Sequence, residues 1–246
     1  MENQNQSIQG DIYQRVPLSE IPWNNEQPPE LLVELIETGK VTPCRAIDLG
    51  CGAGNYAAYL AAKGFNVTGV DMSPTAIKFA RQNAKQKGVK CKFLVGDVIE
   101  HLSETDGRWD FAYDWGLLHH IFPENRQKYV QGVHNVLNPG GKYLSVCFNE
   151  KDTAFARLGE GAAQTKEGIY TSNTSSAIER IETPSRSREG TEKYRKTKLS
   201  STVYLSCEIE LRELFDPFFE IIDFRVLEIK GKIMTHIFNY CFMSRK

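Results

Sequence analysis

A buried strand followed by an alternating glycine loop is the feature that most constrains the fold of this chain. Residues 45–49, Arg-Ala-Ile-Asp-Leu, read as a short buried strand, and glycines then occupy positions 50, 52 and 54. Glycines there let the backbone turn sharply and approach a ligand where a Cβ atom would collide. A second apolar run, residues 66–70, ends on Asp71, an acid able to accept hydrogen bonds from both hydroxyls of a ribose. We therefore predict a nucleotide-like cofactor across the ends of two adjacent parallel strands.

The spacing of the glycines separates two cofactor classes. A dinucleotide site has the pattern G-x-G-x-x-G, whose third glycine allows a helix to pack closely beside a pyrophosphate. Here the glycines alternate and position 55 is Asn, so residues 48–54 read D-x-G-x-G-x-G. This pattern resembles motif I of the class I S-adenosylmethionine-dependent methyltransferases. A dinucleotide-dependent enzyme is the alternative interpretation of the loop.

Composition limits the size and the partners of the protein. A chain of 246 residues is long enough for one α/β domain with an insertion. With 30 basic and 31 acidic residues it has no global field to attract nucleic acid or an anionic membrane, and we expect neither as a partner. The polar N-terminus lacks the apolar core of a signal peptide, so a cytoplasmic location is expected. Six cysteines without a C-x-x-C pair predict small buried side chains, with no metal site and no disulfide framework.

Strand and helix patterns alternate along the first 150 residues and predict an open, mostly parallel sheet with helices on both faces. The predicted strands are residues 44–49, 66–70, 92–95, 109–113 and 142–148, and the predicted helices are 29–36, 54–63 and 74–87. Another helix is expected from about Ser206, and a terminal hairpin from residues 219–229 and 233–243. Class I methyltransferases end with such an antiparallel pair. The predicted fold is therefore a doubly wound, Rossmann-like α/β sheet of seven strands.

Two segments lie outside this scaffold. Residues 1–40 are expected to form an N-terminal lid arm and a helix, in which the proline-rich stretch 13–29 runs extended over the domain. Residues 41–246 form the domain itself, with a polar, basic insertion at about 150–204. The basic tract of that insertion, residues 184–198, is either a solvated loop or a lid that favours anions.

The resemblance runs from about residue 43 to residue 148 and implies a role for each matching residue. Asp48 would hold the amino group of the methionine part, and Gly50, Gly52 and Gly54 would admit that part and shape the turn. Asp71 would accept the ribose hydroxyls. Asp48, Asp71 and Asp97 follow successive strands, and each also has an ordinary interpretation as a helix cap or turn residue.

The adenine ring would lie between the ends of the second and third strands. Met72 would pack on the ring, Asp97 would accept a hydrogen bond from its amino group, and Val98 would flank it. Asp114, which ends the fourth strand, resembles the start of motif IV and would line the methyl-transfer site. His119 and His120 follow, and each is interpreted either as a proton-transfer residue or as a structural hydrogen-bonding group.

The N-terminal arm narrows the subgroup. Residues 21–31, which include Ile21-Pro22-Trp23-Asn24, are similar to the P-W-D-x-G region of the thiopurine, thiol/halide and tellurite-resistance methyltransferases, where a tryptophan arm closes over the cofactor. Two departures are that Asn24 replaces the acid and that the following Gly-Arg is absent. The resemblance implies that Trp23 acts as a lid over the cofactor site and that Tyr13 belongs to the same lid. The alternative is that Trp23 only caps the edge of the sheet.

Together these features imply transfer of a methyl group from S-adenosyl-L-methionine to a small-molecule acceptor, leaving S-adenosyl-L-homocysteine. Transfer to a thiolate or another soft anion needs chiefly alignment and exclusion of water. A soft sulfur, selenium or tellurium acceptor is therefore favoured, because the sequence offers no base beyond the two histidines. The alternatives are methylation of a protein or RNA side chain, and a non-catalytic regulatory protein that binds the cofactor. The protein is expected to be a monomer or a homodimer.

Overall fold

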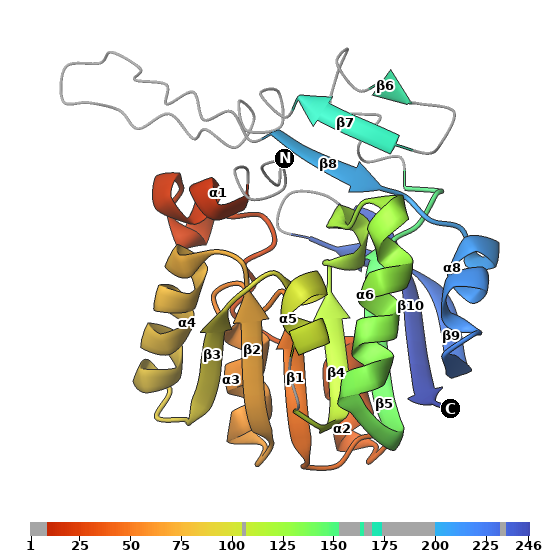
Figure 1. The fold of residues 1–246 in the computed structure, drawn as a ribbon. Coiled ribbons are helices and arrows are strands. Elements are labelled where there is room, and N and C mark those ends of the chain that lie inside the picture. The colour runs from red at the N-terminus through yellow and green to blue at the C-terminus, as the bar shows by residue number, and fades with distance from the viewer. Residues whose placement is uncertain (1–8, 105–106, 153–162, 165–168, 174–199, 232–234) are drawn as a thin grey trace, which may run out of the picture.

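The computed structural model describes residues 9–104, 107–152, 163–164, 169–173, 200–231 and 235–246. Its centre is a seven-stranded sheet with the order β3-β2-β1-β4-β5-β10-β9 (Figure 1). The strands are β1 (Arg45–Leu49), β2 (Asn66–Asp71), β3 (Cys91–Val95), β4 (Trp109–Trp115), β5 (Leu137–Phe148), β9 (Phe219–Lys230) and β10 (Thr235–Arg245). Strands β1 to β5 are parallel, whereas β10 pairs antiparallel with both β5 and β9. The predicted sheet and its terminal hairpin are confirmed.

Helices cover both faces of this sheet, as predicted for a doubly wound fold (Figure 1). On one face lie α5 (Val98–Glu104), α6 (Pro123–Val136) and α8 (Glu208–Phe215), and on the other α2 (Glu30–Glu37), α3 (Asn55–Ala62) and α4 (Pro74–Gln86). Successive strand residues serve opposite faces. Ala112 packs with the α6 side, whereas Phe111 and Tyr113 pack with the α2 and α3 side. The hydrophobic cores on the two faces fix the sheet, so that the carboxyl ends of its parallel strands lie along one edge.

Two sequence-based boundaries were wrong. The stretch 13–29 is not extended throughout. Its first residues belong to the helix α1 (Gln9–Arg15), and the short 3-10 helix η2 (Leu18–Glu20) lies within it. The first proline of the arm is Pro17, so no proline bars a helix before it, and Ile12 and Tyr13 pack against α4. Strand β5 begins at Leu137 instead of residue 142, because Leu137 already pairs with Trp109 of β4.

The insertion after β5 contains regular structure. Strands β6 (Ala163–Gln164), β7 (Ile169–Asn173) and β8 (Ser200–Tyr204) form a separate antiparallel sheet above the carboxyl edge of the main sheet (Figure 1). Val203 and Tyr204 of β8 are buried. The basic tract 184–198, for which a loop and a lid were the two interpretations, lies outside the described residues.

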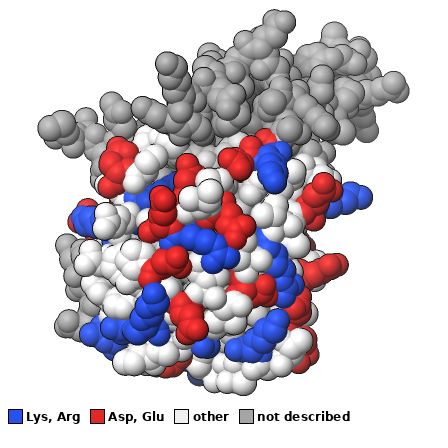
Figure 2. All heavy atoms as spheres, turned by 90° about the vertical axis from the view of Figure 1, so that its right-hand side faces the viewer, with Lys and Arg blue, Asp and Glu red and all other residues white. Residues whose placement is uncertain are grey.

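The surface carries mixed charge on the face that includes the β9 edge. Figure 2 shows Lys and Arg interspersed with Asp and Glu there, without a continuous patch of one sign. None of the helices within the described ranges has both the length and the apolar character needed to cross a lipid bilayer.

Candidate functional site

The glycine loop between β1 and α3 adopts a conformation that only glycine tolerates easily. Gly50, Gly52 and Gly54 have φ angles of 73°, 50° and 71°, in the left-handed region. A Cβ atom at Gly52 would lie 2.6 Å from the hydroxyl of Tyr13, and one at Gly54 would lie 2.8 Å from Ala80. The loop therefore needs glycine for both conformation and space, as expected of a backbone that cradles a ligand.

Asp71 ties this loop to the end of β2. The Gly52 amide donates a hydrogen bond to Asp71 Oδ2 at 2.8 Å, and the Ser73 amide donates to Oδ1 at 2.9 Å. Burial raises the pKa of the Asp71 carboxyl, and these two N–H donors lower it in part. A carboxylate has about four acceptor positions. Both Asp71 oxygens therefore retain acceptor capacity for ribose hydroxyls.

Asp48 lies in β1 just before the loop and is buried, with a residue exposure of 4%. Burial raises its pKa to about 7, and the nearby carboxyl groups of Asp71 and Asp114 add to the rise. The carboxyl ends of β1, β2 and β4 thus bring three acids within electrostatic reach of one another. Concentrated negative charge in a partly dry site favours a cationic ligand.

Residues predicted for the adenine ring lie where β2 and β3 end. Met72 is half-buried directly after β2. Asp97 caps α5, because its Oδ1 accepts the Ile99 amide at 2.9 Å. Val98 is 7% exposed and packs in the core beneath α5 and α6. The ordinary role of Asp97 as a cap is therefore present, and its contact with adenine stays a prediction.

Asp114 turns its carboxyl group into the protein. Its Oδ2 accepts hydrogen bonds from Tyr143 at 2.5 Å and Tyr129 at 3.1 Å, and its Oδ1 accepts the Leu118 amide at 3.4 Å. The residue is fully buried, and burial raises its pKa to about 6 against these donors. The side chain therefore joins β4 to α6 and β5, and it positions the loop that follows instead of facing the carboxyl edge.

That loop lies against the glycine loop and carries the two histidines. Leu117 lies 3.0 Å from the place that a Cβ atom would take on Gly50. His119 is 3% exposed, and its Nδ1 accepts the Phe148 amide at 3.4 Å. Burial, then His120 and other nearby cationic groups, hold the pKa of His119 well below its ordinary value. His119 is thus a neutral, structurally bonded imidazole with its proton on Nε2, which does not suit a general base.

The N-terminal arm closes one side of the glycine loop. Trp23 donates from Nε1 to the Tyr13 hydroxyl at 3.2 Å, and that hydroxyl lies over Gly52. Trp23 is 45% exposed, whereas Tyr13 is buried. The arm therefore covers the predicted cofactor site through Tyr13, with Trp23 outside it.

A chain of three amides fastens the arm to the domain, and the sequence interpretation missed it. Asn55 donates to Asn24 Oδ1 at 2.9 Å, and Asn83 donates to Asn55 Oδ1 at 2.7 Å. Asn24 stands where the similar families have an acid, and it is 8% exposed. The asparagine at position 55, which ends the alternating glycine pattern, was the available signal.

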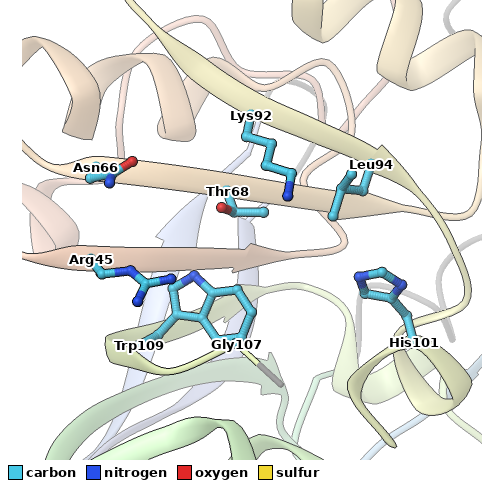
Figure 3. Close-up of a pocket in the computed structure, with 8 residues that line it drawn as sticks. All are labelled: Arg45, Asn66, Thr68, Lys92, Leu94, His101, Gly107 and Trp109. Atoms are coloured by element: carbon cyan, nitrogen blue, oxygen red, sulfur yellow. The ribbon is translucent and has the colours of Figure 1, made fainter. Parts of the chain in front are cut away.

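One hollow lies against β1, β2 and β3, outside the predicted site. It has a volume of about 340 Å³ (Figure 3). Its lining residues are Arg45, Asn66, Thr68, Lys92, Leu94, His101, Gly107 and Trp109. None of these lining residues belongs to the predicted site.

Residues 46–141 match a family model described as a methyltransferase domain. A 2-heptyl-1-hydroxyquinolin-4(1H)-one methyltransferase of Mycobacteroides abscessus is 35% identical over 130 residues, which are 52% of this chain and 56% of that protein. The chain thus matches little more than half the length of this curated relative.

Solved structures agree on the fold. A Burkholderia thailandensis 1,6-didemethyltoxoflavin-N1-methyltransferase with bound S-adenosylhomocysteine has a TM-score of 0.64 at 20% identity, covering 96% of this chain and 84% of that one. TehB of Haemophilus influenzae has a TM-score of 0.60 at 16% identity, covering 91% and 64%. The resemblance stated from the glycine loop is thus supported: residues 46–141 resemble a methyltransferase domain, and the chain has the fold of the class I S-adenosylmethionine-dependent methyltransferases.

Proposed function

We propose that this protein transfers the methyl group of S-adenosylmethionine to a small-molecule acceptor and releases S-adenosylhomocysteine. One observation carries the proposal: the carboxylate of Asp71 is hydrogen-bonded to the glycine loop, and the buried carboxyl group of Asp48 lies within electrostatic reach of it. S-adenosylmethionine supplies an electrophilic methyl group on a positively charged sulfonium, and it carries a second positive charge on its amino group. An acidic edge with a glycine cradle suits such a ligand better than it suits the pyrophosphate of a dinucleotide, which is anionic.

The residues divide this work by position. Asp48 binds the amino group, Gly50, Gly52 and Gly54 receive the methionine part, and Asp71 binds the ribose. At the adenine end, Met72 and Val98 flank the ring and Asp97 accepts from its amino group. Asp114 positions the loop that carries Leu117 and His119. The N-terminal arm excludes water from the site through Tyr13, to which Trp23 donates a hydrogen bond.

The acceptor is a small molecule, and two chemical classes fit. A soft thiol, selenium or tellurium nucleophile needs no base, and the neutral state of His119 is compatible with it. The TehB fold is also compatible. A hydroxyl acceptor is favoured by a separate observation: a second histidine, His236, hydrogen-bonds to the buried carboxyl group of Asp152 near the same edge. The compound in the name of the Mycobacteroides relative, a 1-hydroxyquinolin-4(1H)-one, also carries a hydroxyl group.

A screen with S-adenosylmethionine carrying a labelled methyl group tests the function. We expect label to appear in small thiols, chalcogen oxyanions or aromatic hydroxyl compounds. Label in protein or RNA alone would support the macromolecular alternative. Binding of S-adenosylhomocysteine without transfer to any class would support the non-catalytic alternative. Size-exclusion chromatography with light scattering would distinguish a monomer from a homodimer.

A further inference from the structure

A buried carboxyl group and a partly exposed histidine meet at the carboxyl edge of β5. His236 stands near the start of β10, and its Nδ1 lies 2.9 Å from Asp152 Oδ2. The Asp152 side chain is 1% exposed, whereas the His236 side chain is 19% exposed. The Ile237 amide donates to the same oxygen at 3.0 Å. Since ionised Asp152 is an acceptor, His236 Nδ1 is the donor, and the lone pair of the neutral ring is then on Nε2.

Asp152 is held in place by a polar network. The turn after β5 closes with a hydrogen bond from the Asp152 amide to the carbonyl of Asn149. Asn149 donates to Asn239 Oδ1 at 2.6 Å, and Asn239 donates to the carbonyl of Ser206 at 2.8 Å. These groups are buried and lie on three separate segments. The network therefore fixes the turn that carries Asp152, and the Ile237 amide holds its carboxyl group.

An aromatic surface connects His236 with the methyl-transfer edge. The ring of Phe148 has its centroid 4.1 Å from His119, 4.9 Å from His236 and 4.7 Å from Phe238. Phe148 and Phe238 are half-buried. His119 follows Leu117, which contacts the glycine loop. The four rings thus lead from the glycine loop to His236.

This arrangement has the parts of a general base. A carboxylate that accepts from Nδ1–H fixes the tautomer of an imidazole and stabilises the imidazolium that forms when Nε2 takes a proton. An aromatic ring stacked on Phe148 gains contact area at little entropic cost. A ring that bears a hydroxyl could place its oxygen towards His236.

We propose, as a refinement that rests on the methyl-transfer function above, that His236 is the general base for an aromatic hydroxyl acceptor and that Asp152 is its positioning residue. The acceptor O–H bond breaks and its proton goes to His236 Nε2. An oxygen lone pair forms the new O–CH3 bond, and the electron pair of the S–CH3 bond remains on sulfur, which loses its positive charge. The proton on His236 then passes to solvent. An acceptor that is already ionised omits the first of these steps.

A pair of acceptors with one skeleton tests the proposal. At neutral pH 2-naphthol is mostly protonated, whereas 2-naphthalenethiol is mostly ionised, so only the first requires a base. We expect His236→Gln to lower kcat on 2-naphthol by about 100- to 10,000-fold, and to change kcat on the thiol much less. His134→Gln is the matched control, because His134 lies in the last turn of α6, beside Phe218 and Phe219 and away from the proposed site, and it should leave both rates unchanged.

Several outcomes would overturn this inference. Equal losses on both acceptors, or no loss on 2-naphthol, would remove His236 as the base. Methylation of the thiol alone by the wild-type protein would leave the proposed function standing and reject the hydroxyl acceptor. If the wild-type protein binds S-adenosylhomocysteine but methylates neither compound, an aromatic acceptor is rejected, whether it carries a hydroxyl or a thiol.

A spectroscopic measurement checks the pair without turnover. Nitrogen NMR of histidine side chains in the S-adenosylhomocysteine complex should show neutral His236 protonated on Nδ1. Asp152→Asn should shift the His236 signal towards a mixture of tautomers while the signal of His134, in the last turn of α6, stays unchanged. An Nε2-protonated His236 in the wild-type protein would contradict the assignment of Asp152 as the positioning residue.

Discussion

The Gly52 amide donates a hydrogen bond to the Asp71 carboxylate at 2.8 Å, so the glycine loop and the end of β2 hold each other in place. Tyr13 lies over the same glycine. The predicted cofactor site is thus organised by three parts of the chain that are far apart in sequence. Its geometry is set by the protein itself, which reduces the ordering cost of binding.

Asp71→Ala is expected to weaken binding of S-adenosylhomocysteine by about 30- to 1,000-fold. The reason is the loss of hydrogen bonds from the ribose to a charged acceptor, worth about 2–4 kcal/mol together. Calorimetry measures the affinity, and Asp216→Ala, which removes an exposed carboxylate after α8, is the control. Unchanged affinity in Asp71→Ala would reject the ribose contact.

The Trp23→Ala variant distinguishes the two interpretations of Trp23, as a lid over the cofactor site or as a cap on the edge of the sheet. Because Trp23 is 45% exposed, its removal should change the free energy of unfolding by less than about 1 kcal/mol. Loss of its hydrogen bond to Tyr13 should loosen the cover and lower turnover by about tenfold or more. Thermal unfolding and steady-state kinetics give the two values. Normal turnover together with a clear loss of stability would favour the capping interpretation.

Much of the fold follows from local sequence pattern. The strands up to β4 are short apolar runs bounded by polar residues or glycine, and each expected strand is present within a few residues. The terminal hairpin was equally visible, because two long alternating runs flank Gly231. Helices α5 and α6 were not identified individually, although a parallel sheet requires crossovers at their positions.

Side-chain partners across long separations could not be predicted. Asp152 and His236 are 84 residues apart and meet only because β10 returns beside β5. The direction of the Asp114 carboxyl group depends on Tyr129 and Tyr143, and no spacing in the sequence reveals that arrangement. The glycine loop was predictable for the opposite reason, since its chemistry lies within seven consecutive residues.

The stability of the free protein should depend on pH through Asp48. Its carboxyl pKa of about 7 in the folded state is above the unfolded value of about 3.9, so the folded state binds its proton more tightly. This contribution is fully present below about pH 4 and is lost as the pH rises to about 7. Asp48→Asn should therefore stabilise the protein, relative to wild type, by up to about 4 kcal/mol more at pH 8 than at pH 4. Chemical unfolding at both pH values measures this, and an equal difference at both would contradict it.

Tyr129→Phe tests whether Asp114 has a structural role. Removing one donor to a buried carboxyl group should cost about 1–3 kcal/mol of stability and leave the affinity for S-adenosylhomocysteine within about twofold. Denaturant unfolding and calorimetry give the two quantities. A tenfold loss of affinity at unchanged stability would instead assign Asp114 to ligand binding.

Calorimetric titration of the wild-type protein with S-adenosylhomocysteine and, separately, with NAD tests the central claim most directly. The acidic edge and the alternating glycines predict binding of S-adenosylhomocysteine at one site per chain and no binding of NAD. Binding of NAD alone would contradict the assigned cofactor and the proposed methyl transfer with it.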